Sequence, residues 1–221
     1  MAASPTPLVQ ALLAAAEAVV AGAGELNRLD GYAGDGDLGI TMAQAAQAMK
    51  RVLKDTGDTG PSQQLSACGA AVAREAPSTS GTLVATGLLR AAKALPIDPS
   101  DGVAILLLCF TAAMEGIQAR GKASVGDRTL VDGLDAVCSN LARSAQEGLG
   151  TQQALHSAAG AAASAAEASA SMEPKVGRAS WMAERAAGHP DAGCAMLAIA
   201  MKAAAEAVGG GEGPTGPAQA Q

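Results

Sequence analysis

Residues 155–171 read LHSAAGAAASAAEASAS, and this composition decides the fold. Alanine is the residue that helices favour most, whereas the β-branched and aromatic residues that strands favour are scarce. The bias extends along the whole chain, because 49% of its 221 residues are hydrophobic and yet it has a single Trp, a single Tyr and a single Phe. We therefore expect an all-α protein with closely packed helices and few bulky side chains inside. Residues 155–171 are read as helix, with disorder as the alternative.

Helical periodicity, interrupted by Gly, Pro, Ser and Asp, predicts eight helices. Several of them begin at a capping residue, among them Ser80, Asp101 and Thr129. Short connections predict antiparallel neighbours in an up-and-down array, within one domain over residues 1–208. Residues 209–221 are Gly- and Pro-rich and are read as a flexible tail. The predicted helices cover residues 6–28, 38–55, 61–76, 80–95, 100–119, 129–147, 151–171 and 192–208.

The charge and cysteine content exclude several classes of function. The chain has 21 acidic and 15 basic residues, a net charge of −6, and no basic run, which argues against nucleic acid and against anionic membrane surfaces. The longest apolar run, Val103 to Phe110 extended to Met114, is shorter than the roughly 20 residues of a membrane span. Its four cysteines show no metal-ligand spacing and are read as packed thiols. We expect a cytoplasmic protein without a membrane segment.

The segment from Asp30 to Gly39 reads DGYAGDGDLG and carries three carboxylates and four glycines in ten residues. Oxygen-only ligands suit Mg²⁺ or Ca²⁺, and Mg²⁺ commonly leans on substrate phosphates for the rest of its coordination shell. Asp37 is also placed to cap the helix that follows, where free amides favour an anion. The loop therefore suggests a metal-bridged phosphate compound. The alternative is an Asp/Gly-rich turn with a helix cap.

Further loops have residues suited to a phosphate ligand. Pro77 to Thr82 precedes a helix with hydroxyls and amides, and Gly121 to Asp132 contains glycines, a Lys and an Arg ahead of another. The first is equally an ordinary helix cap. Arg178 lies in an irregular polar stretch, residues 173–190, and either neutralises phosphate oxygens or is a solvated side chain. His189 and His156 are read as structural, and Asp191 as the cap of the last helix.

Taken in this order, the motifs resemble the DhaL family, the nucleotide-binding subunit or domain of dihydroxyacetone kinases. The resemblance runs from about residue 5 to 208 and rests on Asp30, Asp35-Gly36-Asp37, Ser80-Gly81, Gly121 with Thr129 and Asp132, Gly177 to Ser180, and Gly188 to Asp191. It implies an antiparallel eight-helix barrel with an adenine nucleotide, ADP or ATP, held by the loops at one end. Two Mg²⁺ ions would be held by Asp30, Asp35 and Asp37.

The resemblance also implies the nucleotide-binding residues. Those expected near the phosphates are Leu38, Gly39, Ile40, Thr41, Ser80 and Gly81; Gly121, Thr129 and Leu130 belong to the base and ribose region, and Arg178, Asp191, Ala192 and Gly193 close the site. One departure is Leu38, since the family commonly has a His after the third aspartate. The exact sugar and the consequence of Leu38 remain open.

Phosphoryl transfer needs mainly positioning and charge neutralisation, so no catalytic base or nucleophile is assigned. The resemblance implies a kinase of the glycerone kinase type, active with a separate DhaK-type subunit that holds the ketose. The nucleotide either exchanges freely or stays bound and is rephosphorylated by a phosphotransferase-system protein of the DhaM type. A nucleotide-loaded regulatory subunit without turnover is the alternative function, and an Ala-rich bundle with an ordinary acidic turn is a third. A homodimer is left open.

Overall fold

The computed structural model describes residues 5–56, 59–96 and 101–209, and in these ranges the chain is helical and has no strand. Eight helices have fifteen residues or more, which confirms the all-α expectation. The predicted tail lies almost entirely outside the described residues. In chain order the elements are α1 (Pro7–Ala21), α2 (Ala23–Ala33), α3 (Leu38–Asp55), α4 (Pro61–Glu75), α5 (Thr79–Ala94), α6 (Gly102–Gly121), α7 (Leu130–Gln146), α8 (Thr151–Ser169), the 3₁₀ helix η1 (Arg178–Met182), α9 (Ala183–Ala186) and α10 (Ala192–Gly209).

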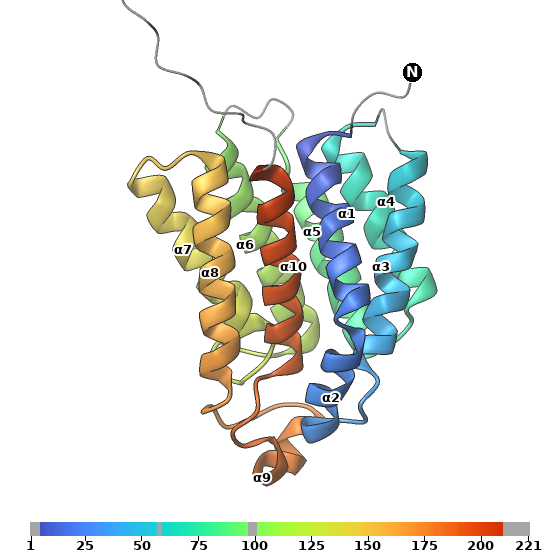
Figure 1. Cartoon of the computed structure of the whole chain (residues 1–221), viewed down its shortest axis with the longest axis vertical. Helices are drawn as coiled ribbons and strands as arrows, with labels where there is room; N and C mark the ends of the chain where they lie inside the picture. Colours follow the sequence, from blue (N-terminus) through green and yellow to red (C-terminus); the bar gives the residue numbers. More distant parts are fainter. Residues whose placement is uncertain (1–4, 57–58, 97–100, 210–221) are drawn as a thin grey trace, which may run out of the picture.

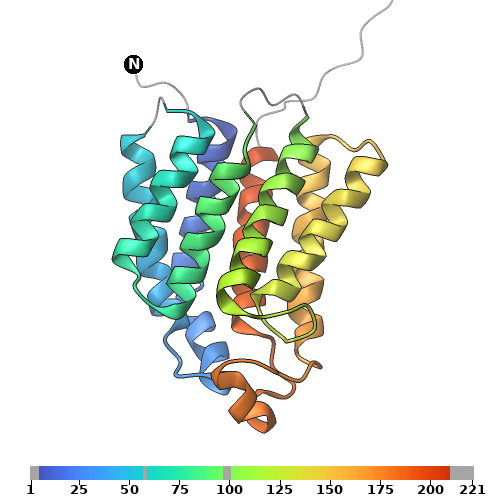
Figure 2. The same cartoon turned by 180° about the vertical axis from the view of Figure 1, so that it is seen from behind.

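The eight long helices form a closed up-and-down ring. Each packs on the next long helix in the chain, from α1 through α3 to α8 and α10, and α10 packs back on α1 to close the ring (Figure 1). The short elements α2, η1 and α9 lie together at one end of the ring, which we call the site end (Figures 1 and 2). Because neighbours run antiparallel, α3, α5, α7 and α10 all begin at the site end.

Local capping explains where several helices begin. Pro7 and Pro61 occupy the first positions of α1 and α4, where a missing amide costs no helical hydrogen bond. Asp101 caps α6 by accepting from the amides of Val103 and Ala104. Thr129 forms a reciprocal capping box with Asp132 at the start of α7. The cap of α5 is Ser78 and not Ser80, because Ser78 accepts from the amide of Gly81 and the helix begins one residue earlier than predicted.

The interior of the ring contains an apolar cavity of about 320 Å³. All its lining residues are Ala, Leu, Val, Met, Ile or Phe, with Phe110 as the single aromatic among them. Alanine-rich helices can approach one another closely around the circumference, but their short side chains do not reach the axis of a ring of this size. The small side chains predicted from the composition therefore leave space at the centre of the ring.

Two helices are long and apolar enough to cross a membrane, although the longest uninterrupted apolar run of the sequence is short. By length and composition α6 and α10 could cross a membrane, with mean hydropathies of 1.7 and 1.4, and α1 with α2 passes the same test as a pair bent by 63°. The expectation that the longest apolar run is too short is therefore wrong. In this fold α6 packs between α5 and α7, and α10 between α8 and α1, with apolar residues of both facing the central cavity.

Two further expectations need correction, and both concern the site end. The predicted helix 6–28 breaks at Gly22, where α1 ends and α2 turns away by 63°, and α2 then continues to Ala33. A side chain at position 22 would come within 3.1 Å of Ile199 Cδ1, so the bend lies against α10. Asp30 is thus in the last turn of a helix and not in a loop. Residues 173–190, which we call the strap, contain η1 and α9 between α8 and α10.

Candidate functional site

Three carboxylates gather at the site end. Single oxygen atoms of Asp30, Asp35 and Asp37 all lie within 4.8 Å of one another. Asp30 comes from the last turn of α2, Asp35 from the connecting loop, and Asp37 from the residue that precedes α3. We call these three residues the acidic cluster. The structure therefore brings together all three metal ligands expected from the sequence.

The loop that holds the cluster is folded around Asp30. Its Oδ2 accepts hydrogen bonds from the amides of Gly36 at 2.9 Å and Asp37 at 3.0 Å, with the amide of Leu38 at 3.4 Å. Gly36 has φ +76°, a left-handed conformation that glycine adopts without steric cost. Asp30 thus organises the backbone of this loop and is at the same time a member of the acidic cluster. Asp37 is at the N-cap position of α3, as predicted, but its side chain makes no capping hydrogen bond.

Arg178 provides a positive charge beside the cluster. It begins η1 in the strap, directly after Gly177 with φ +65°, and its guanidinium donates to Asp35 Oδ2. This hydrogen bond is the main cause that lowers the pKa of Asp35, so its carboxyl stays ionised at neutral pH. The side chain of Arg178 is 64% exposed and that of Asp35 is 50% exposed, so the ion pair adds little to the stability of the fold. Its significance is its position next to three carboxylates.

A cavity of about 280 Å³ lies beside the acidic cluster and shares Asp30 with it. Part of its wall is apolar, including Leu83, Ile117 and Met196. The remaining wall is formed where helices begin: Leu38 opens α3, Thr79 and Ser80 open α5, Thr129 and Leu130 open α7, and Ala192 and Gly193 open α10. Four helix N-termini, with their positive dipole ends, therefore border one cavity.

Asp191 fixes the turn into α10. Its Oδ1 accepts from the amide of Cys194 at 2.8 Å, and its own amide donates to Ser169 Oγ at 2.8 Å, so the predicted N-cap is confirmed. Burial raises the pKa of this carboxyl, while the amide of Cys194 and the charge of Arg128 act in the opposite direction. The Asp191 carboxylate thus lines the cavity and is held in place by the hydrogen bond from the amide of Cys194.

Five of the thirteen expected nucleotide residues do not line the cavity: Gly39, Ile40, Thr41, Gly81, and Arg178, which contacts the acidic cluster instead. Gly39 and Gly81 permit close backbone contacts: a Cβ at Gly39 would lie 1.9 Å from Ala23 O, and one at Gly81 would lie 2.0 Å from Ala76 O. Ile40 is 54% exposed. Thr41 sits in the first turn of α3 outside the cavity wall. Eight of the expected nucleotide residues line the cavity together with Asp30 of the acidic cluster: Leu38, Ser80, Gly121, Thr129, Leu130, Asp191, Ala192 and Gly193.

Several residues that the sequence analysis left without a role hold the site together. Asn27 Oδ1 accepts from the amide of Ile40 at 3.1 Å and joins α2 to α3. The ring of Tyr32 stacks on that of His189, with centroids 3.5 Å apart and planes 4° from parallel. Arg185 donates to Gly31 O at 2.7 Å. The stack agrees with the prediction that His189 has a structural role. Nothing in the sequence indicates that its partner is Tyr32.

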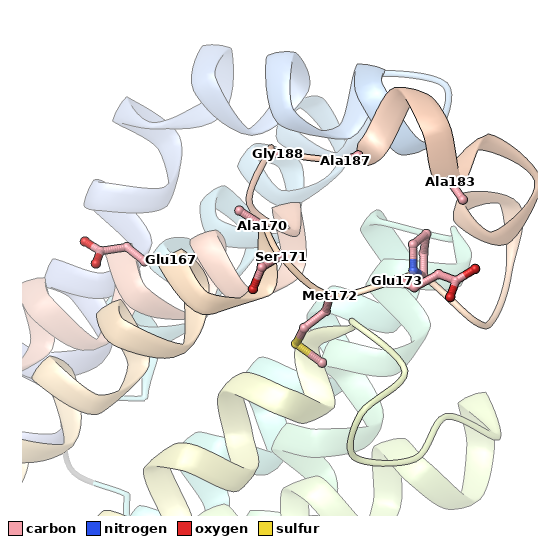
Figure 3. Close-up of a pocket in the computed structure, with 9 residues that line it drawn as sticks. Glu167, Ala170, Ser171, Met172, Glu173, Ala183, Ala187 and Gly188 are labelled. Carbon is pink, nitrogen blue, oxygen red and sulfur yellow. The ribbon is translucent and has the colours of Figure 1, made fainter.

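A second depression of about 520 Å³ lies behind the strap and shares no lining residue with the first. It separates residues 170–174, after α8, from Ala183, Ala187 and Gly188 (Figure 3). Its ionisable lining residues are Glu167 and Glu173, and it has no cation and no helix N-terminus of a long helix. Although larger, it lacks the chemistry of the cavity beside the acidic cluster. We call it the rear hollow.

The donors of the acidic cluster fit a hard divalent cation. All three are carboxylates, which Mg²⁺ and Ca²⁺ prefer, and they come from a short segment whose backbone is fixed by Asp30. The neighbouring helix N-termini would favour an anion such as phosphate. A carboxylate suited to a metal ion, Asp30, and helix N-termini suited to an anion thus border the same cavity.

The fold and the site define a class of protein: a ring of helices with an acidic cluster at one end. Comparisons with known proteins place the chain in such a family. The DAK2 domain family matches residues 32–206. The ADP-binding subunit DhaL of the PEP-dependent dihydroxyacetone kinase of Escherichia coli is 32% identical over 184 residues, covering 80% of this chain and 88% of that subunit. The chain belongs to the DAK2 domain family, in the DhaL branch that the sequence resembles.

Longer relatives contain the same region as one part. The human triokinase/FMN cyclase is 35% identical over 182 residues, which are 82% of this chain and 31% of that protein. The dihydroxyacetone kinase of C. freundii, solved in its native form and with AMP-PNP and Mg²⁺, matches with a TM-score of 0.73 at 22% identity, over 93% of this chain. This chain spans about a third of the length of these longer proteins, and the structural match supports the fold.

Proposed function

We propose that this chain binds a Mg²⁺-bridged adenine nucleotide and acts as the phosphoryl-transfer subunit of a ketose kinase. The observation that carries the proposal is that four helix N-termini border one cavity and that the cavity shares Asp30 with the acidic cluster beside it. Helix N-termini favour phosphate, and carboxylates favour Mg²⁺, so a compound containing both satisfies the two halves of the site. The family membership and the AMP-PNP and Mg²⁺ of the C. freundii kinase structure support it.

The proposed roles follow the geometry. Asp30, Asp35 and Asp37 would hold two Mg²⁺ ions. The first turns of α3 and α5, with Leu38 to Thr41 and Ser80-Gly81, would face the phosphates with the positive ends of both helix dipoles. Gly121, Thr129 and Leu130, beside the apolar wall of the cavity, would contact the base and ribose, and the turn from Asp191 to Gly193 would close that side. Leu38, where the family commonly has His, is 8% exposed and offers an apolar contact only.

The chemistry that this chain supplies is positioning and charge neutralisation. Bound Mg²⁺ would neutralise part of the phosphate charge and lower the barrier to phosphoryl transfer. Arg178 is placed to add a second cation, since its guanidinium already reaches the acidic cluster. No thiol competes as a nucleophile, because burial raises the pKa of all four cysteines. The reaction therefore needs no base or nucleophile from this chain.

We further propose that the ketose is held by a separate DhaK-type subunit in the cytoplasm. The support is that the Escherichia coli relative, of which this chain covers 88%, is named as an ADP-binding subunit, whereas the longer relatives are named as whole kinases. The phosphoryl donor is either free ATP or a DhaM-like phosphotransferase-system protein that rephosphorylates bound ADP. A homodimer of this chain is compatible with both.

The first test is thermal unfolding of the full chain with Mg²⁺ alone, with ADP alone and with both. A ligand that binds only the native state must raise the melting temperature. We expect a large rise only with both present, because neither half of the site is complete without the other. The protein should first be denatured and refolded to remove any copurified nucleotide. Equal melting temperatures without ligand, with Mg²⁺, with ADP and with both would refute the Mg²⁺-nucleotide site.

The second test separates turnover from a regulatory role. The chain is mixed with a purified DhaK-type subunit, dihydroxyacetone or erythrulose, and either ATP or a phosphorylated DhaM-type donor. Formation of sugar phosphate that depends on both subunits supports the kinase, and the donor that works identifies the type. Mg²⁺-ADP binding without turnover with either donor would favour the alternative, a nucleotide-loaded regulatory subunit.

A further inference from the structure

Arg128 is the one charged residue in the described part of the chain that is buried, with 3% of its surface exposed. Burying a guanidinium is costly unless hydrogen bonds compensate for the lost water. Its backbone adds to the cost, because φ is +60°, in the left-handed region that residues with a Cβ rarely adopt. A position with two unfavourable features needs specific contacts to hold it.

Those contacts are with the strap. Arg128 Nη2 donates to Ala186 O at 2.7 Å and to His189 O at 2.6 Å, which are 58 and 61 residues further along the chain. The carbonyl of the preceding residue, Asp127, accepts from the amide of Lys175 at 3.2 Å. Two adjacent residues before α7 therefore bind both the beginning and the end of the strap.

The loop that carries Arg128 is itself held firmly at the start of α7. The two carboxylate oxygens of Asp132 accept from the amides of Gly126 at 2.5 Å and Thr129 at 2.7 Å, one on each side of Arg128. Cys194 Sγ donates to Thr129 O at 3.1 Å and links the same loop to α10. The backbone of Arg128 is thus held by contacts with α7 and α10 of the ring, independently of the strap.

The helical part of the strap, η1 and α9, has little apolar packing of its own, whereas Val176 before it packs against the core. Within η1 and α9, Ala186 is the single buried residue. The rear hollow separates α9 from residues 170–174, and one backbone hydrogen bond, from Gly188 N to Ala170 O at 3.0 Å, links the two sides (Figure 3). Apart from the contacts with Asp127 and Arg128, the strap side chains Arg178, Arg185 and His189 contact α2 and the loop after α2, which belong to the site.

We propose that Arg128 is a positioning residue that anchors the strap to the ring and so holds Arg178 and the Asp191 turn at the site. The role in binding rests on the function proposed above, whereas the anchoring itself does not. Arg128 Nε and Nη1 have no hydrogen-bond partner in the described residues. An apolar side chain would fill the same space without leaving buried donors unsatisfied, so the contacts of Nη2 are what the arginine provides.

The strap contains its own reporter. Trp181 is the only Trp of the sequence, lies in η1, and is 85% exposed. Its fluorescence anisotropy decay measures motion of the strap without nucleotide or metal. Hydrogen exchange of residues 175–190 gives a second measure, read against the amides of α7 as an internal reference.

The test compares Arg128→Met with Arg128→Lys and with Arg143→Met, an exposed arginine on α7 that serves as the control. In Arg128→Met we expect a faster anisotropy decay of Trp181 and an increase of about tenfold or more in exchange of the strap, because hydrogen bonds from a charged donor are lost. The dissociation constant of Mg²⁺-ADP should rise by a similar factor. Arg128→Lys should show a smaller effect, since one ammonium replaces a planar group. Arg143→Met should match the wild type.

The outcomes distinguish the anchoring of the strap by Arg128 from the proposed binding of Mg²⁺-ADP. Unchanged Trp181 motion and strap exchange in folded Arg128→Met would overturn the anchor. A loosened strap in a protein whose wild type also fails to bind Mg²⁺-ADP would support the anchor and overturn the proposed function. Should Arg128→Met not fold, Arg128→Gln, which removes the charge and keeps a polar group, decides: a strap as rigid as in the wild type overturns the proposal, and a selectively looser one supports it.

Discussion

Replacing Asp37 by Asn should make the ligand-free protein more stable at low salt and yet abolish stabilisation by Mg²⁺-ADP. The substitution preserves shape and removes one negative charge from the acidic cluster. Oxygens of its two neighbours, Asp30 and Asp35, lie within 4.8 Å. No capping hydrogen bond of the Asp37 side chain is lost. The two effects have opposite signs, which general damage to the fold would not produce.

The magnitude follows from Coulomb's law. Unit charges 4.8 Å apart repel by about 0.9 kcal/mol in water, for each of the two neighbours. The charge of Asp37 at the start of α3 is favoured by the helix dipole, which offsets about 0.5 kcal/mol. Arg178 beside Asp35 reduces the repulsion further. A net gain of about 1 kcal/mol corresponds to a rise of about 2–4 °C in melting temperature for a chain of this size.

The assay is thermal unfolding in about 10 mM and about 150 mM salt, conditions whose Debye lengths differ by about fourfold. The gain of the ligand-free variant should shrink as salt is added. In the wild type, Mg²⁺-ADP at about a thousand times its Kd should add about 4 kcal/mol, or about 8–16 °C. In the variant this shift should be lost.

The matched control is Asp55→Asn, because Asp55 is exposed and lies at the far end of the same helix. It should leave the Mg²⁺-ADP shift unchanged. A full shift in Asp37→Asn would refute the assignment of Asp37 as a metal ligand. A clear fall in the melting temperature of the ligand-free variant at low salt would refute the repulsion argument and give Asp37 a structural role.

Three further predictions concern packing, the strap and the thiols. Gly39→Ala should destabilise the protein by several kcal/mol in urea unfolding, because its Cβ would lie 1.9 Å from Ala23 O; a loss below about 1 kcal/mol would contradict this contact. Arg178→Met should weaken Mg²⁺-ADP binding about tenfold in calorimetry while the ligand-free melting temperature changes by less than about 2 °C, since exposed ion pairs add little stability. Burial raises the pKa of Cys68 to about 11 and raises that of Cys194, so both stay protonated at pH 8 and should react with a thiol reagent only on unfolding; fast reaction of the native protein would contradict this.

The ring of helices could be predicted from the sequence because its signals are local. Alanine content, periodicity and caps such as Thr129 and Asp101 act within a few residues of the helix they begin. The break at Gly22 is not local in this sense. Glycine is tolerated within helices, and what ends α1 here is the packing of that bend against Ile199, far away in the chain.

The acidic cluster could also be predicted, because its three carboxylates lie within eight residues. The packing of Gly39 and Gly81 could not be predicted. A glycine that contacts a ligand and a glycine that packs against another backbone look the same in sequence, and the contacts with Ala23 and Ala76 appear only in the fold. Arg128 shows the same limit, since an arginine in a polar loop is usually solvated and its burial depends on carbonyls 58 and 61 residues away.

The position of the site follows from two interruptions of one regular pattern. In an up-and-down ring alternate helices begin at the same end, so four N-termini gather there before any binding residue is specified. The chain then departs from the pattern twice, with α2 between α1 and α3 and with the strap between α8 and α10, and both departures lie at that end (Figure 1). They contact each other through Arg178 with Asp35, Arg185 with Gly31, and His189 with Tyr32. The ring thus provides the anion-type half of the site and α2 the acidic half, while the strap, which is attached to the ring through Arg128, brings a cation to where the two halves meet.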